Sequence, residues 1–199
     1  MIRGVIPPVP IEEIPAEYRQ TADMMSRLVG DATTIQVFAH SMPSTDFYFQ
    51  TFYRQMFYNE RPGLKVDQHL KQVMRLRISK RHGCALCNRA NEEEVRALGL
   101  SEAQVDAFFE DEPSADLFDE AELAVIAFTD QMVLTNQDGS LDRPLYDRLR
   151  RSFSDEQIVE MAMVAAVLIG AAKMTFVLDL VPREAVCEFA APTKPLVAA

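Results

Sequence analysis

Residues 67–99, DQHLKQVMRLRISKRHGCALCNRANEEEVRALG, contain two helical patterns separated by a single glycine. Asp67 is a favourable N-cap residue for the first pattern, and Gly83 is the residue type that most often ends a helix. The second pattern begins at or near Cys84 and ends at Gly99. The stretch therefore predicts two consecutive helices, with a close pair of cysteines at the start of the second.

Helix signals of the same kind occur along the rest of the chain. Ser101 and Ser154 are each followed three residues later by a glutamine, which is the capping-box pattern of a helix start. No segment keeps the strict alternation of a β-strand, and only 7 of the 199 residues are glycine. The sequence therefore predicts an all-α fold, a multi-helix bundle of about eight helices.

The two ends of the chain differ from this pattern. Residues 1–15 contain four prolines, which predict an extended arm over the surface. The tail from about 190 to 199, AAPTKPLVAA, is expected to be loose. Because no long linker separates the helical segments, we expect a single domain over residues 1–199.

Charge and cysteine content exclude several classes of protein. The net charge of −10 argues against a nucleic-acid partner. Three cysteines are too few for a disulfide scaffold of this size. The N-terminal sequence MIRGVIPPVPIEEIP lacks the apolar run of a signal peptide, because proline and acidic residues interrupt it. We therefore expect a cytoplasmic protein.

One apolar stretch, residues 161–181, is about long enough to cross a bilayer. Lys173 and Asp179 lie inside it and would be costly at depth, so we expect a buried core helix and no membrane partner. Apolar residues cover most of the circumference of the helix predicted from Ser154 to Leu180. A small domain cannot easily cover such a helix on every side, which predicts a homo-oligomer formed through helices.

Cys84 and Cys87 carry the clearest chemical signal. At a spacing of three they face the same way on a helix, and the first-turn N–H groups and the helix dipole stabilise a thiolate. Lys80, Arg81 and Arg89 add positive charge nearby. The pattern favours a redox dithiol over the alternative of two buried core cysteines. Structural zinc is disfavoured, because four ligands at suitable spacing are not evident.

Three other groups of residues have both structural and functional interpretations. The basic run from Lys65 to Arg81 is expected to be a solvated face rather than an anion site. The acidic run from Glu92 to Glu94 is expected on the outer face of the helix that carries the cysteines. The aromatic residues between Phe47 and Phe57 are expected in the core or at a subunit interface, although a hydrophobic substrate would also need such a wall.

Five segments in the same order resemble the carboxymuconolactone decarboxylase and alkylhydroperoxidase-D superfamily. The central ones are LRISKRHGCALC, RALGLSEAQVDAF and FDEAELAVIAFTDQM. The upstream AHSMPSTDFYFQTFYRQMFY and the downstream FSDEQIVEMAMVAAVLIGAAKMTF complete a resemblance over roughly residues 33–182. It implies an all-helical alkylhydroperoxidase-D-like bundle whose subunits associate as dimers, trimers or hexamers.

The CxxC pair resembles the peroxidase branch of this superfamily, whereas the lactone decarboxylases generally lack it. The resemblance implies that Cys87 is oxidised by an organic peroxide and that Cys84 then closes the disulfide. Helix electrostatics alone would instead make Cys84 the more acidic thiol. The resemblance further implies a thiol reductant as partner. The thiol chemistry calls for no metal, flavin or nucleotide cofactor, and the sequence has no glycine-rich phosphate loop.

The sequence departs from that branch at two positions. Gln72 stands where the branch has a glutamate, and Asn91 stands where it has a histidine. Neither side chain can take a proton at neutral pH. His82, just before Gly83, is either a replacement base or a solvated histidine at the helix end.

We therefore carry three hypotheses forward. The first is a thiol-dependent peroxidase-like enzyme, weakened at positions 72 and 91, that acts on a small-molecule peroxide or hydrophobic substrate. The second is a carboxymuconolactone decarboxylase-like enzyme of aromatic catabolism. The third is a non-enzymatic, redox-responsive oligomer.

Overall fold

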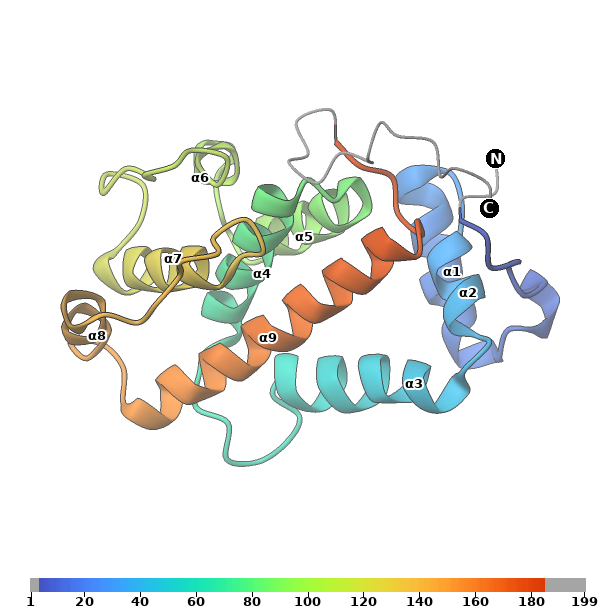
Figure 1. Cartoon of the computed structure of the whole chain (residues 1–199), viewed down its shortest axis with the longest axis horizontal. Helices are drawn as coiled ribbons and strands as arrows, with labels where there is room; N and C mark the ends of the chain where they lie inside the picture. The colour runs from blue at the N-terminus through green and yellow to red at the C-terminus, as the bar shows by residue number, and fades with distance from the viewer. Residues whose placement is uncertain (1–3, 185–199) are drawn as a thin grey trace.

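A computed structural model describes residues 4–184, which form helices and no β-strand (Figure 1). The prediction of an all-α, multi-helix bundle is therefore confirmed. Cys187 and the C-terminal tail lie outside the described residues. The elements are η1 (Ile11–Glu13), α1 (Ala16–Val29), α2 (Thr33–Phe38), α3 (Met42–Asp46), η2 (Phe47–Phe57), α4 (Gln68–His82), α5 (Ala85–Ala97), α6 (Glu102–Ala107), α7 (Glu120–Met132), α8 (Arg143–Leu149) and α9 (Asp155–Val177).

The N-terminal arm packs against the bundle instead of extending freely. The Val9 N–H donates to the Gln36 carbonyl, and Ile14 is buried. Local signals set the helix that follows, since Gly30 ends α1 in the left-handed conformation with φ 83°. The arm thus covers α2 and brings α1 to its place beside α5.

Helix α4 is the central element, and it packs against α5, α7 and α9. The Asp67 side chain accepts from the His69 N–H at its start, and Gly83 with φ 65° ends it. Both boundaries agree with the sequence prediction. Apolar residues Val73, Met74 and Leu76 are fully buried along it.

The expectation that the basic run is a solvated face is wrong for α4. Four of its cations are buried, and each meets an acidic side chain from a neighbouring helix. The pairs join α4 to three helices. Lys71 pairs with Glu160 of α9, and Arg77 pairs with Asp130 of α7. Arg75 and Lys80 pair with Glu94 and Glu92 of α5, respectively. Ion pairing therefore allows a charged helix to occupy the centre.

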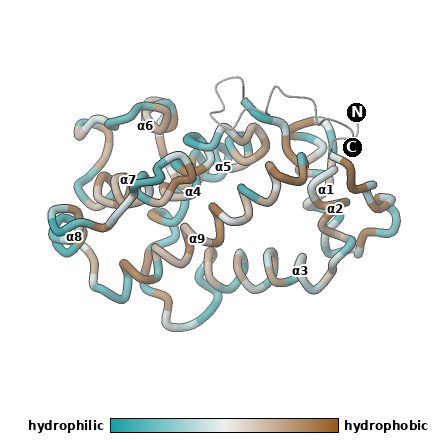
Figure 2. Tube along the Cα trace, in the orientation of Figure 1, coloured by the Kyte–Doolittle hydropathy of each residue, from teal (hydrophilic) through white to brown (hydrophobic). Residues whose placement is uncertain are grey.

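Helix α9 crosses the molecule and contacts α4, α7 and η2 (Figure 1). Its predicted capping box, Ser154 with Gln157, is present. Within residues 4–184 it is the one helix long and apolar enough to span a membrane, and 44% of its apolar window is buried. The expectation of a buried core helix holds on one side only, because Val159, Met163 and Val177 are exposed on the other. Figure 2 shows the largely hydrophobic trace of this helix.

The aromatic segment is a π-helix, η2, which the sequence pattern did not distinguish from an α-helix. The preceding helix α3 begins at Met42 and ends at Asp46, directly before η2. The Tyr58 N–H donates to the Tyr53 carbonyl, five residues back, as π-helical geometry requires. Residues five apart therefore fall on one face, which brings Tyr48, Tyr53 and Tyr58 into one row.

Candidate redox site

Cys84 and Cys87 form a disulfide at the junction of α4 and α5, with their Cα atoms 5.2 Å apart. Cys84 is the N-cap of α5, and its sulfur accepts the Cys87 N–H at 3.2 Å. The left-handed Gly83 turns the chain sharply enough to start the new helix at once. The break predicted from the sequence therefore places both sulfurs at a helix N-terminus, where a thiolate is stabilised.

The two cysteines differ in exposure. Cys84 is 1% exposed, whereas Cys87 is partly exposed. The segment after α9 covers Cys84, since the Ala85 N–H donates to the Pro182 carbonyl and the Glu184 N–H to the Gly83 carbonyl. Sequence reasoning missed this cover, because it comes from residues about 100 positions away. An incoming substrate reaches Cys87 more readily than Cys84.

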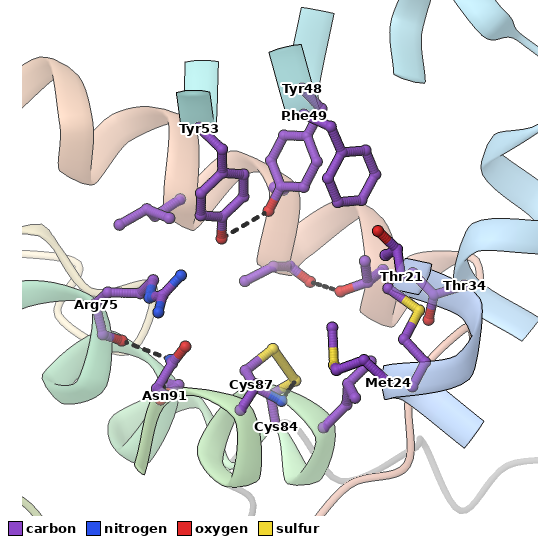
Figure 3. A pocket seen from close by; sticks show the side chains of 18 of the residues that line it. Thr21, Met24, Thr34, Tyr48, Phe49, Tyr53, Arg75, Cys84, Cys87 and Asn91 are labelled. Carbon is purple, nitrogen blue, oxygen red and sulfur yellow. Dashed lines mark hydrogen bonds between the residues drawn. A yellow bond between two sulfur atoms is a disulfide. The ribbon is translucent and has the colours of Figure 1, made fainter. Parts of the chain in front are cut away.

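Both cysteines line a cavity of about 470 Å³ between α1, η2, α5 and α9. Tyr48, Phe49 and Tyr53 project from η2 into this space, facing the disulfide (Figure 3). Phe52 and Phe57 lie in the core as expected, whereas these three pack against the core and also line the candidate site, as the alternative of a wall for a hydrophobic substrate implied. Helices α1 and α9 add further apolar lining residues, namely Met24, Met25, Leu168, Ala171 and Ala172.

Asn91 and Gln72 are both buried, but they are placed differently. Asn91 lines the cavity one turn beyond Cys87, and its amide donates to the Arg75 carbonyl and to Ser79 Oγ at 2.9 Å. Gln72 is not among the lining residues, and its amide donates to Glu94 at 2.5 Å. The structure thus brings Asn91 to the dithiol and turns Gln72 towards a carboxylate.

His82 lines the cavity and is fully buried, so the interpretation as a solvated helix-end histidine is wrong. Its Nε2 accepts the Leu134 N–H at 3.1 Å. Burial lowers the pKa of His82 to about 4, which keeps the ring neutral. Because Nε2 already accepts this bond, the ring is poorly placed to take a proton from a thiol.

A polar corner of the cavity is formed by Tyr58, Arg75 and Glu94. Tyr58 donates to Glu94 at 3.0 Å, and Arg75 pairs with the same carboxylate at 2.6 Å. Burial raises the pKa of Tyr58 to about 12, so its hydroxyl stays protonated. The expectation that Glu94 lies on the outer face of α5 is therefore wrong, because its side chain lines the cavity. Its spacing of seven from Cys87, two helical turns, is the signal that could have found it.

Metal ligands do not cluster in the described structure. Over residues 4–184, no group of three or more histidine, cysteine or acidic side chains is arranged to hold an ion. The site therefore consists of a dithiol, an aromatic wall and a polar corner. Such a set of groups can accept or deliver electrons through sulfur and can bind an apolar molecule beside it.

No family model matches the chain, and no curated protein matches it. Solved structures do match. The debrominase Bmp8, in complex with 2,3,4-tribromopyrrole, is 21% identical with a TM-score of 0.66, and the match covers 91% of this chain and 92% of that one.

Two peroxidase-related proteins match over similar lengths. The first, from Ralstonia eutropha and described as an alkylhydroperoxidase core, is 17% identical with a TM-score of 0.65, covering 92% of this chain and 93% of that one. The second, from a Silicibacter species, is 15% identical with a TM-score of 0.68, covering 94% of each chain. The chain therefore has the alkylhydroperoxidase-D-like fold that the sequence resemblance implied.

Proposed function

We propose that the protein is a thiol-dependent oxidoreductase that reduces an organic hydroperoxide with the Cys84–Cys87 dithiol. The observation that carries this proposal is the asymmetry of the pair, with Cys87 open to the cavity and Cys84 buried behind it. The peroxidase-related neighbours support it at the level of the fold. The debrominase neighbour indicates that the same fold also serves other reactions.

In the proposed reaction the Cys87 thiolate attacks the terminal oxygen of the hydroperoxide. The O–O bond breaks, its electron pair leaves with the alkoxide, and the alkoxide takes a proton to become an alcohol. Cys87 is then a sulfenic acid. The Cys84 sulfur attacks it, a disulfide forms, and water leaves with the hydroxyl oxygen. An external dithiol reductant restores both thiols, which is consistent with the proposed cytoplasmic location.

Proton transfer is the weak part of this site. Asn91 and Gln72 cannot exchange protons at neutral pH, and the Nε2 of His82 accepts a backbone bond. General acid–base help is typically worth about 10²–10⁴-fold in rate. We therefore expect slow turnover unless the substrate brings a good leaving group.

A second candidate reaction, reductive dehalogenation of an aromatic compound, is favoured by the aromatic wall and by the debrominase neighbour. One thiolate takes the halogen from carbon, the carbon takes a proton, and the second thiol displaces halide to form the disulfide. The net change converts an aryl halide and two thiols into an arene, a disulfide and a hydrogen halide. This route makes no demand for a good oxygen leaving group.

The experiment uses the fully reduced protein with one equivalent of cumene hydroperoxide. We expect the loss of two thiols per chain, with mass mapping that joins Cys84 to Cys87. Cys87→Ser abolishes peroxide consumption, and Cys187→Ser is the control that leaves it unchanged. Bromide release from a bromophenol, with excess dithiothreitol, tests the second reaction in parallel. Inert thiols in both assays would contradict the oxidoreductase and leave the decarboxylase-like and non-enzymatic hypotheses.

We also propose that the chain assembles as a homo-oligomer through α9. The exposed side of this helix presents Val159, Met163, Gly170, Met174 and Val177, at spacings of three, four or seven residues, which place them in one stripe. A second copy of the same stripe would remove its apolar side chains from water.

A further inference from the structure

The polar corner of the cavity contains hydrogen-bond donors that the protein itself does not use. Arg75 is buried and lines the cavity, with its side chain directed into the space above the disulfide (Figure 3). Among residues 4–184, its Nε has no hydrogen-bond partner. A buried guanidinium normally satisfies most of its five N–H groups, because leaving them unpaired is costly.

The other guanidinium nitrogens are only partly engaged. Nη1 lies 3.5 Å from the Tyr58 hydroxyl, which is at the limit of a hydrogen bond. Nη2 lies 2.6 Å from Glu94 in an ion pair. Glu94 is the acidic side chain paired with the guanidinium in the described structure, and it also accepts from Tyr58 and Gln72. The carboxylate balances the charge of Arg75 but leaves N–H donors unused.

Tyr53 adds a second donor to the same corner. Its ring lies beside the guanidinium, with the Arg75 Cζ 5.6 Å from the ring centroid. Its hydroxyl points into the cavity and accepts from Tyr48 at 3.5 Å (Figure 3). The structure shows no acceptor for the Tyr53 proton within residues 4–184. Two donors from different elements, the Arg75 Nε of α4 and the Tyr53 hydroxyl of η2, thus face one space without donating to an acceptor among residues 4–184.

We propose that Arg75 and Tyr53 bind the oxyanion head of an aromatic acid, with its ring against the aromatic wall and its reactive edge towards Cys87. A negatively charged acceptor can receive hydrogen bonds from both the guanidinium and the phenol. Such charge-assisted hydrogen bonds are stronger than those between neutral groups. Tyr48 and Phe49 offer faces for a flat ring, and the cavity volume exceeds that of a two-ring acid. This inference rests on the proposed function in one respect, namely that the part of the ligand facing Cys87 is the part that reacts.

Charges at the cavity mouth do not supply this recognition. Arg54 and Glu60 also line the cavity, but they pair with each other at 2.5 Å and are more than half exposed. Glu17 is exposed as well. Arg75, although paired with Glu94, is therefore the buried cation among the lining residues, and its unused N–H donors act where water screens charge little.

The test measures binding to the oxidised protein, in which the disulfide prevents turnover. The probes are 2-naphthoate and the neutral 2-naphthamide, which have the same shape, and the method is titration calorimetry. We expect the parent to bind naphthoate at least 10-fold more tightly than naphthamide. Arg75→Gln removes this preference and leaves naphthamide binding within about twofold. The control is Arg96→Gln, because Arg96 lies on the exposed side of α5 and pairs with Glu102. It should change the affinity for neither naphthoate nor naphthamide.

Tyr53→Phe keeps the ring and loses one donor, so it serves if Arg75→Gln fails to fold. We expect it to weaken naphthoate about threefold to 10-fold and naphthamide not at all. Equal affinity of the parent for the two probes, no binding of either, or equal losses in the variants would overturn the proposal. Peroxide consumption is measured separately with cumene hydroperoxide, which has no acidic head. Failure of that assay with naphthoate selectivity intact would refute the proposed function alone.

Discussion

Helices α4 and α9 contact each other at the centre of the molecule, and the burial of each is opposite to its hydropathy. Helix α4 has four cations among its buried residues, whereas α9 is the most apolar helix and exposes a stripe of apolar side chains. Hydropathy alone would predict a buried α9 and an exposed α4. The difference teaches that ion pairs with neighbouring helices can bury a charged helix, and that an apolar face left open indicates a partner.

The largest expected effect concerns the buried ion pairs of α4. Arg77 is 0% exposed, pairs with Asp130 at 2.7 Å and donates to the carbonyls of Phe108 and Glu110. Arg77→Ala leaves these acceptors unpaired, so we expect a loss of about 3–5 kcal/mol in the free energy of unfolding, measured with urea.

The matched control lies one turn along the same helix. Arg81 pairs with the exposed Asp111, and Arg81→Ala should cost less than about 1 kcal/mol. Similar losses for Arg77→Ala and Arg81→Ala would contradict the account of α4 as a helix held in the core by its ion pairs.

A pH effect is expected at the last residue of α4. The pKa of His82 is about 4 in the folded protein and 6.5 when unperturbed, so the unfolded chain binds the extra proton first. His82 therefore contributes to the free energy of unfolding in full above pH 6.5. This contribution, about 3 kcal/mol in total, is lost as the pH falls from 6.5 towards 4. His82→Gln keeps an acceptor for the Leu134 N–H and should flatten the pH dependence of the urea midpoint. An unchanged slope would show that His82 is not buried as described.

The exposed stripe of α9 gives the next prediction. The parent should sediment as a multiple of 22.5 kDa at micromolar concentration. Met163→Glu places a charge in the middle of the stripe and should weaken association about 100-fold, or roughly 2.7 kcal/mol. Phe47→Glu, at an exposed aromatic residue on η2, is the control. A parent protein that sediments at 22.5 kDa, the mass of one chain, would show that the stripe does not bind a second copy of the protein.

The smallest expected effect is on the rate of peroxide consumption. Asn91→His places an imidazole one turn from Cys87 and should raise the rate about 10-fold, or 1.4 kcal/mol off the barrier. Adding Gln72→Glu alone should bring no further gain, because the new carboxylate would face Glu94. Adding both Gln72→Glu and Glu94→Gln to Asn91→His keeps one amide and one carboxylate in contact. A further gain in rate is therefore expected only in this triple variant. A parent as fast as Asn91→His would mean that another group already moves the proton.

Local signals in the sequence predicted the helix boundaries well. Gly83 ends α4, and the capping boxes at Ser101 and Ser154 begin α6 and α9 as expected. Cys84 and Cys87 also share one helix start. Each of these features depends on residues within about four positions of one another, which is why a single sequence can reveal it.

Tertiary placement was the part that the sequence did not reveal. The burial of Arg75 depends on Glu94 and on the aromatic residues of η2, which belong to other helices. The π-helical spacing that turns Tyr53 into the cavity has no distinct hydrophobic period. The cover over Cys84 comes from Pro182, at the far end of the described chain. Such contacts follow from how the helices pack, and hydropathy does not encode them.

The most direct test of the site is to identify the cysteine that becomes a sulfenic acid. The reduced Cys84→Ser and Cys87→Ser variants each receive one equivalent of cumene hydroperoxide in the presence of dimedone, and the adducts are mapped by mass. The account predicts an adduct on Cys87 in Cys84→Ser and no adduct on Cys84 in Cys87→Ser, because only Cys87 opens substantially to the cavity. An adduct on Cys84 with Cys87 unmodified would contradict it.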